Sequence, residues 1–402
     1  MSLSTAGTKD KRAITCQKAT AYRVEREKLA ALNEKLIQMK IGDFEYCDKQ
    51  LKLGDLSGNR FTIVLRNIEG IGDDQIKLYV ENFMRTGFIN YYGLQRFGTL
   101  TVPTYDIGKS VLKKNWFEAV DLILIGLDEA LSVWAKTKDA AEACKFLPKS
   151  QNQIEGSLLL SLKKHQPTKN YAAAFNSIPR NIRNLYLHSV QSLLWNKLAS
   201  KRVEKYGTQV LDGDFYVQND RCAEYQIVDS NSKEQVEHFQ IVIPFFASPD
   251  HLPKNEMSQW YDELLNEEGI TWDQLQQGSK EYALHGGFRK LFVKINNDNN
   301  FSYEILRYDD FNQILTSTDL DILNGKTLSL KNSDSCKYKG LKIEFNLPSS
   351  SYATMALREL TKCDFSKQNQ TNLTKKLAEN ENSKNEDQIS PATDDDADEV
   401  DC

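Results

Sequence analysis

Hydrophobic residues change their spacing several times along this 402-residue chain, and no other feature limits its fold as strongly. In residues 58–67 (GNRFTIVLRN) they alternate, with Phe61, Ile63 and Leu65 on one side of the segment. Side chains of a strand point to opposite faces in turn, so the pattern predicts a strand buried on one face and partly on the other. The fold must therefore contain a sheet.

Three segments instead repeat their hydrophobic residues at the helical period of about 3.6 residues. The first, at residues 24–36, sets leucines among charged residues, and we expect its polar face to contact solvent. The second begins near Asp73 or Asp74, either of which is available as N-cap, and ends before Gly87. The third runs from Pro179 to Gly207, and its predicted buried stripe consists of Leu187, Val190, Leu194 and Leu198.

Shorter patterns follow in the second half of the chain. Residues 208–328 combine short strand patterns (DFYVQ, HFQIVIPFF, FRKLFVKI and FSYEILRY) with a helical pattern near residues 256–266, which predicts a mixed α/β region. Residues 341–347 predict another strand. Residues 352–362 predict a helix that Ser350 or Ser351 can cap.

Charge is distributed unevenly along the chain. Residues 379–402 hold ten acidic residues and one lysine, a net charge of −9, whereas residues 1–378 hold 50 basic and 46 acidic residues, a net charge of +4. The mildly basic main part is compatible with a polyanionic ligand. From residue 367 onward the chain is polar and has no aromatic residue, which predicts a disordered acidic tail over residues 365–402.

Several classes of protein lack support in the sequence. The longest apolar stretch, residues 116–135, contains four acidic residues, and none approaches the roughly 20 apolar residues that span a bilayer. The first residues contain no apolar region of a secretory signal, so we expect an intracellular location, in the nucleus, the cytoplasm or both. The seven cysteines are scattered, which predicts reduced thiols.

Familiar cofactor and catalytic motifs are also missing. Residues 108–110 and 325–327 resemble the ends of phosphate-binding P-loops, but each lacks the required earlier glycine. The sequence has no GxGxxG, GxSxG or HExxH motif, and its five histidines are separated from one another. We therefore expect neither a metal ion nor a small-molecule cofactor.

Three polar runs remain as candidate sites. The first, AGTKDKRA at residues 6–13, places Asp10 among Lys9, Lys11 and Arg12. Nearby positive charges favour the ionised carboxylate that a nucleophile needs, and the same cations can bind phosphates. The alternative is a solvated turn, which the charge pattern alone favours.

The other two runs contain aromatic side chains. NYYGLQRFG at residues 90–98 can stack an unpaired base on a ring and bind its edge through amide groups, whereas the alternative is an aromatic turn in the core. SYATMALREL at residues 351–360 has Tyr352 as its second residue and Arg358 six positions after that tyrosine. Taken alone, this third run is typical of an ordinary amphipathic helix.

Five runs, taken in order, resemble the TruD family of RNA pseudouridine synthases in its eukaryotic form. They are GTKDKRA at residues 7–13, GNRF at 58–61, NYYGLQRFG at 90–98, PRNIRNLYLHSVQSLLWN at 179–196 and SYATMALREL at 351–360. The resemblance implies an α+β fold, in which a catalytic domain with a mixed sheet is split by an inserted α/β TRUD domain. Residues 1–115 and 327–364 would form the catalytic domain and residues 116–326 the inserted domain.

The resemblance also implies an activity. The family isomerises uridine to pseudouridine in RNA by detaching the base, rotating it and rejoining it through carbon 5, without a metal or a cofactor. For this chain it implies RNA as the partner, tRNA first, with mRNA as an open second substrate. The target base would flip out of the RNA into the pocket. We expect a monomer that does not bind membranes.

Residue roles follow where the motifs match. Asp10 matches the family's catalytic nucleophile, and Asn90 and Tyr352 match residues that contact the target nucleoside. Tyr92 stands where the family more often has phenylalanine, and it keeps an aromatic face for stacking. The basic residues expected to bind the substrate, mainly through phosphate or carboxylate groups, are Lys9, Lys11, Arg12, Arg96 and Arg358.

The start of the chain differs from the family. Only nine residues precede Asp10, whereas family members carry a sizeable N-terminal segment with strands of the catalytic sheet and further site residues. We therefore expect part of the site to be missing. A fragment, an incomplete gene model and a degenerate paralogue stay open, and the alternative function is a catalytically inactive RNA-binding chain.

Overall fold

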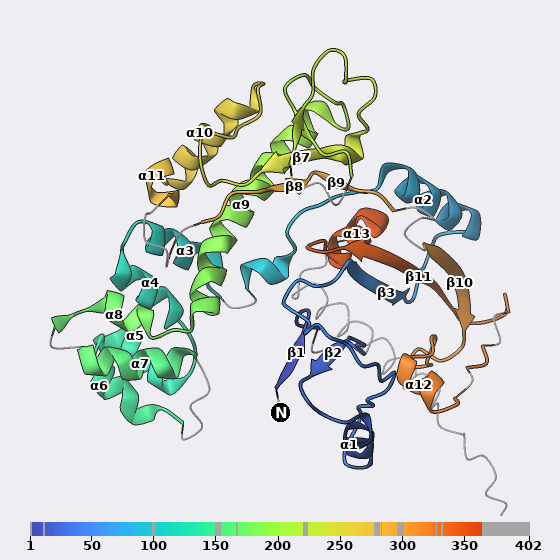
Figure 1. Cartoon of the computed structure of the whole chain (residues 1–402), viewed down its shortest axis with the longest axis horizontal. Coiled ribbons are helices and arrows are strands. Elements are labelled where there is room, and N and C mark those ends of the chain that lie inside the picture. The colour runs from blue at the N-terminus through green and yellow to red at the C-terminus, as the bar shows by residue number, and fades with distance from the viewer. Residues whose placement is uncertain are drawn as a thin grey trace, which may run out of the picture. The chain divides into compact units, whose positions relative to one another are not determined.

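The structure is a computed structural model that describes residues 2–10, 13–98, 101–148, 154–165, 168–219, 224–276, 282, 284–295, 301–326, 328–330 and 333–363. Helices and strands are mixed along the chain (Figure 1), which confirms the predicted α+β class. Contacts divide the chain into two compact units, Met1–Tyr91 with Tyr216–Val242 and Lys290–Ala356, and Tyr92–Phe215 with Ile243–Arg289 and Leu357–Cys402. The domain limits implied by the family resemblance stay a prediction.

Strands of the described residues form four sheets. Their orders are β1 (Leu3–Thr5)–β2 (Ala19–Ala21), β4 (Phe88–Ile89)–β9 (Phe292–Val293), β10 (Ser302–Tyr308)–β11 (Tyr338–Pro348)–β3 (Gly58–Leu65), and β6 (Gln226–Ile227)–β5 (Phe215–Tyr216)–β7 (Ile241–Pro244)–β8 (Phe288–Lys290). The α-helices are α1 (Arg26–Ala30), α2 (Asp73–Thr86), α3 (Thr104–Leu112), α4 (Trp116–Ile123), α5 (Glu129–Thr137), α6 (Ala140–Ala143), α7 (Ile154–His165), α8 (Tyr171–Asn176), α9 (Arg180–Tyr206), α10 (Met257–Glu268), α11 (Trp272–Leu275), α12 (Asp319–Leu323) and α13 (Ala353–Thr361). Short 3₁₀ helices are η1 (Ala31–Glu34), η2 (Leu94–Phe97), η3 (Cys144–Phe146) and η5 (His238–Gln240).

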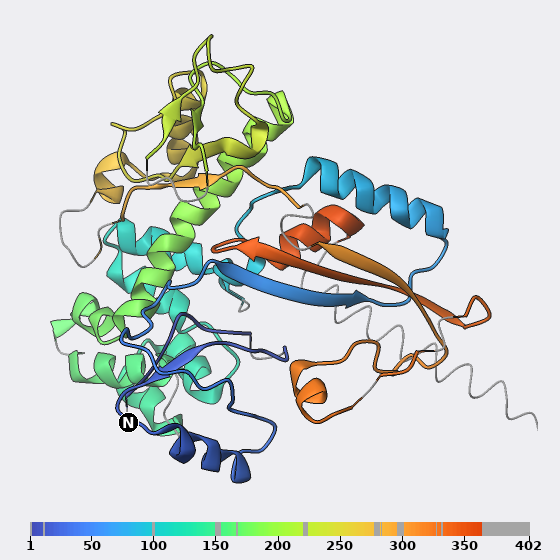
Figure 2. The same cartoon turned by 45° about the vertical axis from the view of Figure 1, so that its right-hand side comes forward.

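The three-stranded antiparallel sheet is the centre of the first unit. β3 and β11 pair along the whole of β3, from Gly58 opposite Pro348 onward (Figure 2). Phe61 lies opposite Phe345, and their ring centroids are 5.9 Å apart. Such cross-strand aromatic pairs stabilise a sheet. The predicted strands at residues 58–67 and 341–347 are therefore confirmed.

Helix α2 confirms the second predicted helix. Its buried side chains are Ile76, Val80 and Phe83, and the Phe83 ring lies 6.4 Å from that of Phe301, just before β10. The helix ends at Gly87, whose φ of 62° is a left-handed conformation that favours glycine.

The N-cap predicted for this helix is wrong. Gly72 occupies that position, and no side chain caps the helix. Asp73 instead forms ion pairs with Arg307 of β10 at 2.6 Å and with Lys339 of β11 at 2.8 Å. Two cations that are distant in sequence bind this carboxylate, so Asp73 connects α2 to the sheet.

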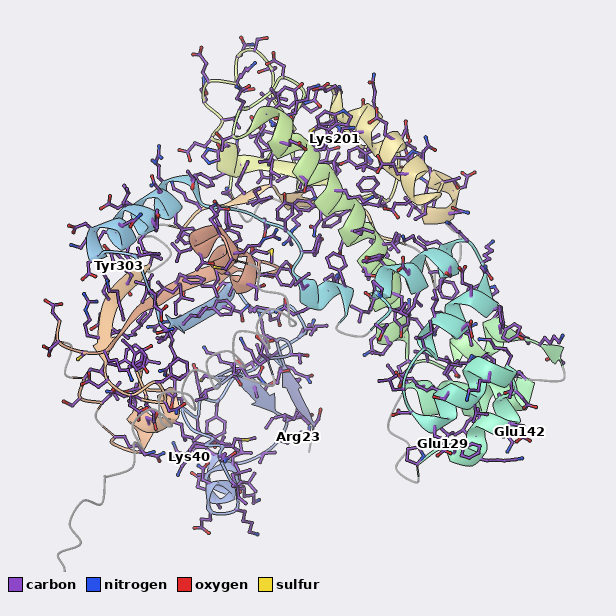
Figure 3. All side chains as sticks on the ribbon, turned by 180° about the vertical axis from the view of Figure 1, so that it is seen from behind. Arg23, Lys40, Glu129, Glu142, Lys201 and Tyr303 are labelled. Carbon is purple, nitrogen blue, oxygen red and sulfur yellow. The ribbon has the colours of Figure 1, made fainter. Side chains whose placement is uncertain are left out.

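The first predicted helix, at residues 24–36, is present only in part. α1 is five residues long, and the 3₁₀ helix η1 follows directly. None of the described residues among 2–57 is buried, and Leu32 is 38% exposed. Short helices need tertiary packing to extend, and none of the leucines here is buried. Arg23, one residue before this segment, and Lys40, four residues after it, are both exposed (Figure 3).

Helix α9 is the main element of the second unit. It spans 27 residues, and the predicted stripe of Leu187, Val190, Leu194 and Leu198 is buried, at 2% exposure or less. Helix α3 packs closely against it at Gly108. A Cβ on that glycine would lie 2.2 Å from the carbonyl oxygen of Tyr186, so a larger residue would separate the two helices.

The mixed region predicted over residues 208–328 is also present. DFYVQ contains β5, HFQIVIPFF contains η5 and β7, and FRKLFVKI contains β8 and β9. The predicted helix near residues 256–266 is α10. The remaining pattern, FSYEILRY, forms β10 and pairs with β11.

Helix α13 confirms the last predicted helix, but its predicted cap is wrong. The carbonyl oxygen of Tyr352 accepts the first helical amide, from Met355, over 3.0 Å. The hydroxyl of Ser351 is buried without a hydrogen-bond partner among the described residues, and Ser350 has a φ of 68°. A turn therefore replaces the expected serine cap.

Three other expectations concern the chain as a whole. The described cysteines have free thiols: Cys16, Cys47, Cys144, Cys336 and Cys363. Among the described residues, no helix combines the length and the apolar composition needed to cross a bilayer. The acidic tail predicted over residues 365–402 lies outside the described residues.

Candidate functional site

The segment that carries Asp10 is tied to the start of β3. Nζ of Lys9 donates a hydrogen bond to Oδ1 of Asn59 over 2.5 Å. Asn59 belongs to the GNRF run and pairs with Leu347 of β11. The preceding residue must be Gly58, because a Cβ there would lie 2.2 Å from the carbonyl oxygen of Leu347. Two of the five runs thus meet at one end of the three-stranded sheet.

A third run begins at the same end. β11 ends at Pro348, opposite Gly58, and the amide of Ser351 donates to the carbonyl oxygen of Pro348 over 3.2 Å. This turn leads directly into Tyr352 and α13. The structure therefore brings the segments of Asp10 and Tyr352 to one sheet end, although nearly the whole sequence separates them.

Exposure differs among the residues at this end. Asp10 is exposed, whereas Lys9 and Tyr352 are partly buried. An exposed carboxylate is accessible to a substrate as large as RNA. Arg12 and its neighbour Lys11 lie outside the described residues. The roles expected for these residues stay predictions.

Asn90 is held by a different part of the first unit. Only 5% of it is exposed. Its amide donates to the carbonyl oxygen of Leu291 over 2.9 Å, and its side-chain Nδ2 donates to that of Lys290 over 3.2 Å. The β4–β9 pair, which sets Phe88 opposite Val293, lies beside these bonds. Backbone and side chain of Asn90 are thus fixed by one short segment.

Tyr92 is held within the second unit, mainly by α9. Its amide donates to Oδ1 of Asn196 over 2.8 Å, and Nδ2 of Asn196 donates back to its carbonyl oxygen over 3.0 Å. Its ring meets the Trp195 ring edge to face, 5.8 Å between centroids. The guanidinium carbon of Arg289 lies 4.2 Å from the Tyr92 centroid. The run NYYG therefore also has the contacts of an aromatic turn.

Arg96 contacts the same side of α9. Its Nε donates to Oγ of Ser192 over 3.2 Å, and its guanidinium carbon lies 5.6 Å from the Tyr92 ring centroid. Burial, followed by the positive charge of Arg96, lowers the pKa of His188. A neutral His188 does not add to the positive charge here. Arg358, the last predicted substrate residue, is exposed on α13.

Among the residues that the structure describes, no three His, Cys, Asp or Glu side chains are grouped so that they could hold a metal ion. The chemistry that the described groups can offer is that of a carboxylate, of amides and of guanidinium or ammonium cations.

Sequence reasoning assigned no role to three residues that hold the candidate site. Asn59 and Asn196 lie inside runs that carry the family resemblance, so their position was the available signal. Arg289 lies outside all five runs. Nothing near it in sequence distinguishes it from an ordinary strand residue.

Comparison with known proteins agrees with these runs. The model of the family described as tRNA pseudouridine synthase D (TruD) matches residues 1–360. The human Pseudouridylate synthase 7 homolog is 41% identical over 383 residues, covering 91% of this chain and 55% of that protein. Multisubstrate pseudouridine synthase 7 of Schizosaccharomyces pombe is 33% identical, covering 89% of this chain and 57% of that protein. This chain thus spans about half the length of these curated relatives.

A solved structure shows the same fold. It is a Methanosarcina mazei protein described as a candidate tRNA pseudouridine synthase D (TruD), and it matches with a TM-score of 0.65 and 22% sequence identity. The match covers 90% of this chain and 81% of that one. The family model covers most of the sequence, and the ordered runs agree with it. The chain belongs to the tRNA pseudouridine synthase D (TruD) family.

Proposed function

We propose that this chain isomerises uridine to pseudouridine in tRNA, with Asp10 as the nucleophile. The Lys9–Asn59 hydrogen bond is the observation that carries the proposal. It ties the segment of Asp10 to the sheet end from which Tyr352 follows, so a carboxylate and an aromatic ring from distant parts of the sequence share one region. The names of the relatives, which describe pseudouridine synthases, support the same activity.

The chemistry needs few groups. The Asp10 carboxylate attacks carbon 1′ of the target ribose and forms a bond to it as the bond from that carbon to N1 of uracil breaks. The rotated base then rejoins the ribose through its carbon 5, and the bond to the carboxylate breaks. A proton leaves carbon 5 and N1 gains one, so the product is an isomer. Asn90 and Tyr352 hold the nucleoside, Tyr352 by stacking on the flipped base. Arg12, Arg96 and Arg358 contact phosphate groups, and Lys9 holds the segment of Asp10 on Asn59.

A nucleotide map of pseudouridine tests the proposal. The full chain, a version extended upstream, and Asp10→Asn variants of both are incubated with unmodified tRNA and, separately, with mRNA. Asn keeps the volume of Asp and removes the charge, so we expect conversion to disappear while affinity for RNA stays within about threefold. Asp48→Asn is the matched control, since Asp48 is another exposed aspartate of the same unit.

Two results would contradict the proposal. Conversion by the Asp10→Asn variant would place the nucleophile elsewhere. RNA binding without conversion by both unsubstituted versions would favour the alternative, an inactive RNA-binding chain. Conversion of tRNA but not mRNA would restrict the substrate to tRNA.

A further inference from the structure

A buried arginine lies against the ring of Tyr92, the second tyrosine of the NYYG run. Arg289, in β8, is 6% exposed. Its guanidinium carbon lies 4.2 Å from the centroid of Tyr92 and 5.4 Å from that of Trp195. A guanidinium at this distance attracts the face of a ring strongly, and more so where water is excluded.

The two residues that follow Arg289 hold the residue that begins the same run. The carbonyl oxygen of Lys290 accepts a hydrogen bond from Nδ2 of Asn90, and that of Leu291 accepts one from its amide. Residues 289–291 therefore contact both ends of the segment 90–92, through one side chain and two carbonyl groups. Only Tyr91 separates Tyr92 from Asn90, so the ring contact and the two hydrogen bonds act on one short segment.

Helix α9 binds the Tyr92 backbone and contacts its ring. Asn196 binds the amide and the carbonyl oxygen of Tyr92, and Trp195 contacts the ring edge to face. Arg96 lies farther from the ring, at 5.6 Å. Of these two cations, Arg289 lies closer to the ring.

We propose that Arg289 is a positioning residue, which orients Asn90 by clamping the Tyr92 ring. The inference rests on the proposed function, in which Asn90 contacts the target nucleoside. Tyr92 then supports the loop, and the face that Arg289 covers is not the face on which a base stacks. Neither its charge nor its place in the sequence marks Arg289 for this role.

Amide hydrogen exchange tests the clamp without an assay of activity. In Arg289→Met we expect the amides of Asn90 and Tyr92 to exchange about tenfold faster, because the ring loses its cation. Arg289→Lys keeps the charge without the flat guanidinium, so its exchange should be intermediate. The Leu194 amide, inside α9, reports on overall stability and should change little.

Arg183→Met is the matched control. Arg183 is a buried arginine of the same unit, 8% exposed, with its guanidinium carbon 5.8 Å from the Tyr282 ring centroid. We expect Arg183→Met to lower thermal stability and to leave exchange at Asn90 and Tyr92 unchanged. Equal exchange there in wild type and Arg289→Met, or equal acceleration in both Met variants, would overturn the proposal.

Kinetics add a second measurement. For Arg289→Met we expect kcat to fall by about 10- to 100-fold with the KM for tRNA little changed, since a misplaced contact affects the reacting geometry more than binding. Tyr92→Leu removes the ring that Arg289 contacts, so its kcat should resemble that of Arg289→Met. A wild-type chain without turnover would refute the proposed function, and hydrogen exchange would still decide the clamp.

Discussion

Arg202 of α9 and Asp214 form an ion pair of 2.9 Å with both side chains 1% exposed. Asp214 also accepts hydrogen bonds from the amide of Leu211 at 3.0 Å and from Nδ2 of Asn255 at 2.8 Å. Two other guanidinium nitrogens of Arg202, Nε and Nη1, are buried without a hydrogen-bond partner among the described residues. The Tyr206 ring lies 5.2 Å from the guanidinium carbon. The buried guanidinium of Arg202 therefore depends on the Asp214 carboxylate to balance its charge.

Removal of Asp214 should be strongly destabilising. Asp214→Ala leaves a buried guanidinium without its carboxylate, and breaking one side of such a pair costs about 3–5 kcal/mol of unfolding free energy. Lys205→Ala is the control, because the Lys205–Glu256 pair is half exposed and such pairs contribute about 0–1 kcal/mol. Urea denaturation of both variants measures the difference. Equal losses would show that the buried pair is as weak as the exposed one.

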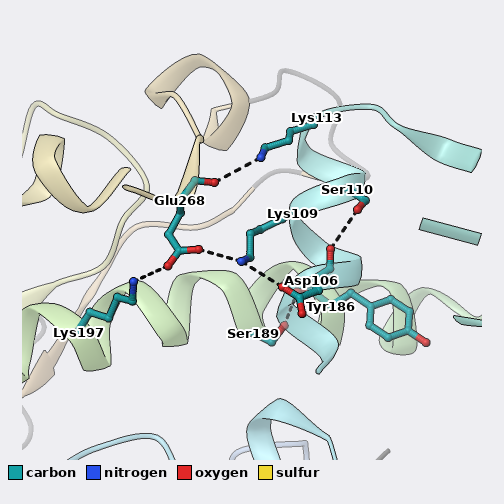
Figure 4. A network of polar contacts seen from close by, with 8 residues as sticks. All are labelled: Asp106, Lys109, Ser110, Lys113, Tyr186, Ser189, Lys197 and Glu268. Atoms are coloured by element: carbon teal, nitrogen blue, oxygen red, sulfur yellow. Dashed lines mark hydrogen bonds and ion pairs between the residues drawn. The ribbon is translucent and has the colours of Figure 1, made fainter. Parts of the chain in front are cut away.

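A second polar network makes stability depend on pH. Glu268, at the end of α10, accepts a hydrogen bond from Lys109 at 2.8 Å and pairs with Lys197 at 2.5 Å (Figure 4). Burial opposes ionisation of Glu268, but the hydrogen bonds and charges of the two lysines outweigh burial and lower its pKa below 4.5. The folded state thus binds the Glu268 proton more weakly than the unfolded chain does.

The direction of the pH effect follows from that shift. A lowered carboxyl pKa stabilises the fold above the unfolded value of 4.5, and this stabilisation is lost as pH falls through the lower folded pKa. We expect the unfolding free energy of wild type to fall below about pH 4.5 more steeply than that of Glu268→Gln. Denaturation between pH 3 and 7 checks this, and parallel curves would contradict it.

Helix packing at Gly108 gives a prediction with an internal control. Gly108→Ala would place a methyl group 2.2 Å from the Tyr186 carbonyl oxygen and 2.6 Å from Cγ2 of Val190. Overpacking of this kind costs about 1–3 kcal/mol, more than the helical preference of alanine returns. Gly156→Ala, in α7, meets only Leu147 at 3.7 Å and should stabilise by up to about 1 kcal/mol. Thermal unfolding should move the two Tm values in opposite directions.

Sequence patterns predicted the helices and strands in which buried residues recur at a regular spacing. The α9 stripe and the β3 alternation were visible because burial repeats with the geometry of the element. The length of the helix at residues 26–30 was overestimated, because the spacing of leucines does not show whether a core covers them. Asp73 was misassigned as a cap because its partners, Arg307 and Lys339, are far away in the sequence.

The sequence likewise predicted some residues of the candidate site and missed others. Runs of unusual composition pointed to Asp10, Asn90 and Tyr352, but no spacing rule could show that Lys9 binds Asn59. Arg289 left no signal at all, because its importance lies in a ring contact across the fold. Family resemblance supplies roles for residues within runs, whereas the residues that hold those runs in place are visible only in three dimensions.

The last prediction concerns Lys9, which the sequence assigned to phosphate binding. In the structure its ammonium group donates to Asn59, and this contact is partly buried. If the bond positions Asp10, then Lys9→Met and Asn59→Leu remove the same interaction. The double variant should then be no worse than either single variant, each with kcat lowered by about tenfold.

A matched control lies next to Asn59 in β3. Arg60 pairs with Glu344 at 2.6 Å while its side chain is 70% exposed, so Arg60→Met should leave kcat near wild type. Single-turnover conversion of tRNA by the four chains of the cycle and by the control measures the coupling. Additive losses for Lys9 and Asn59 would mean that Lys9 acts on the RNA directly, as its sequence suggested. Strong coupling would mean that Asn59 holds the segment that presents Asp10.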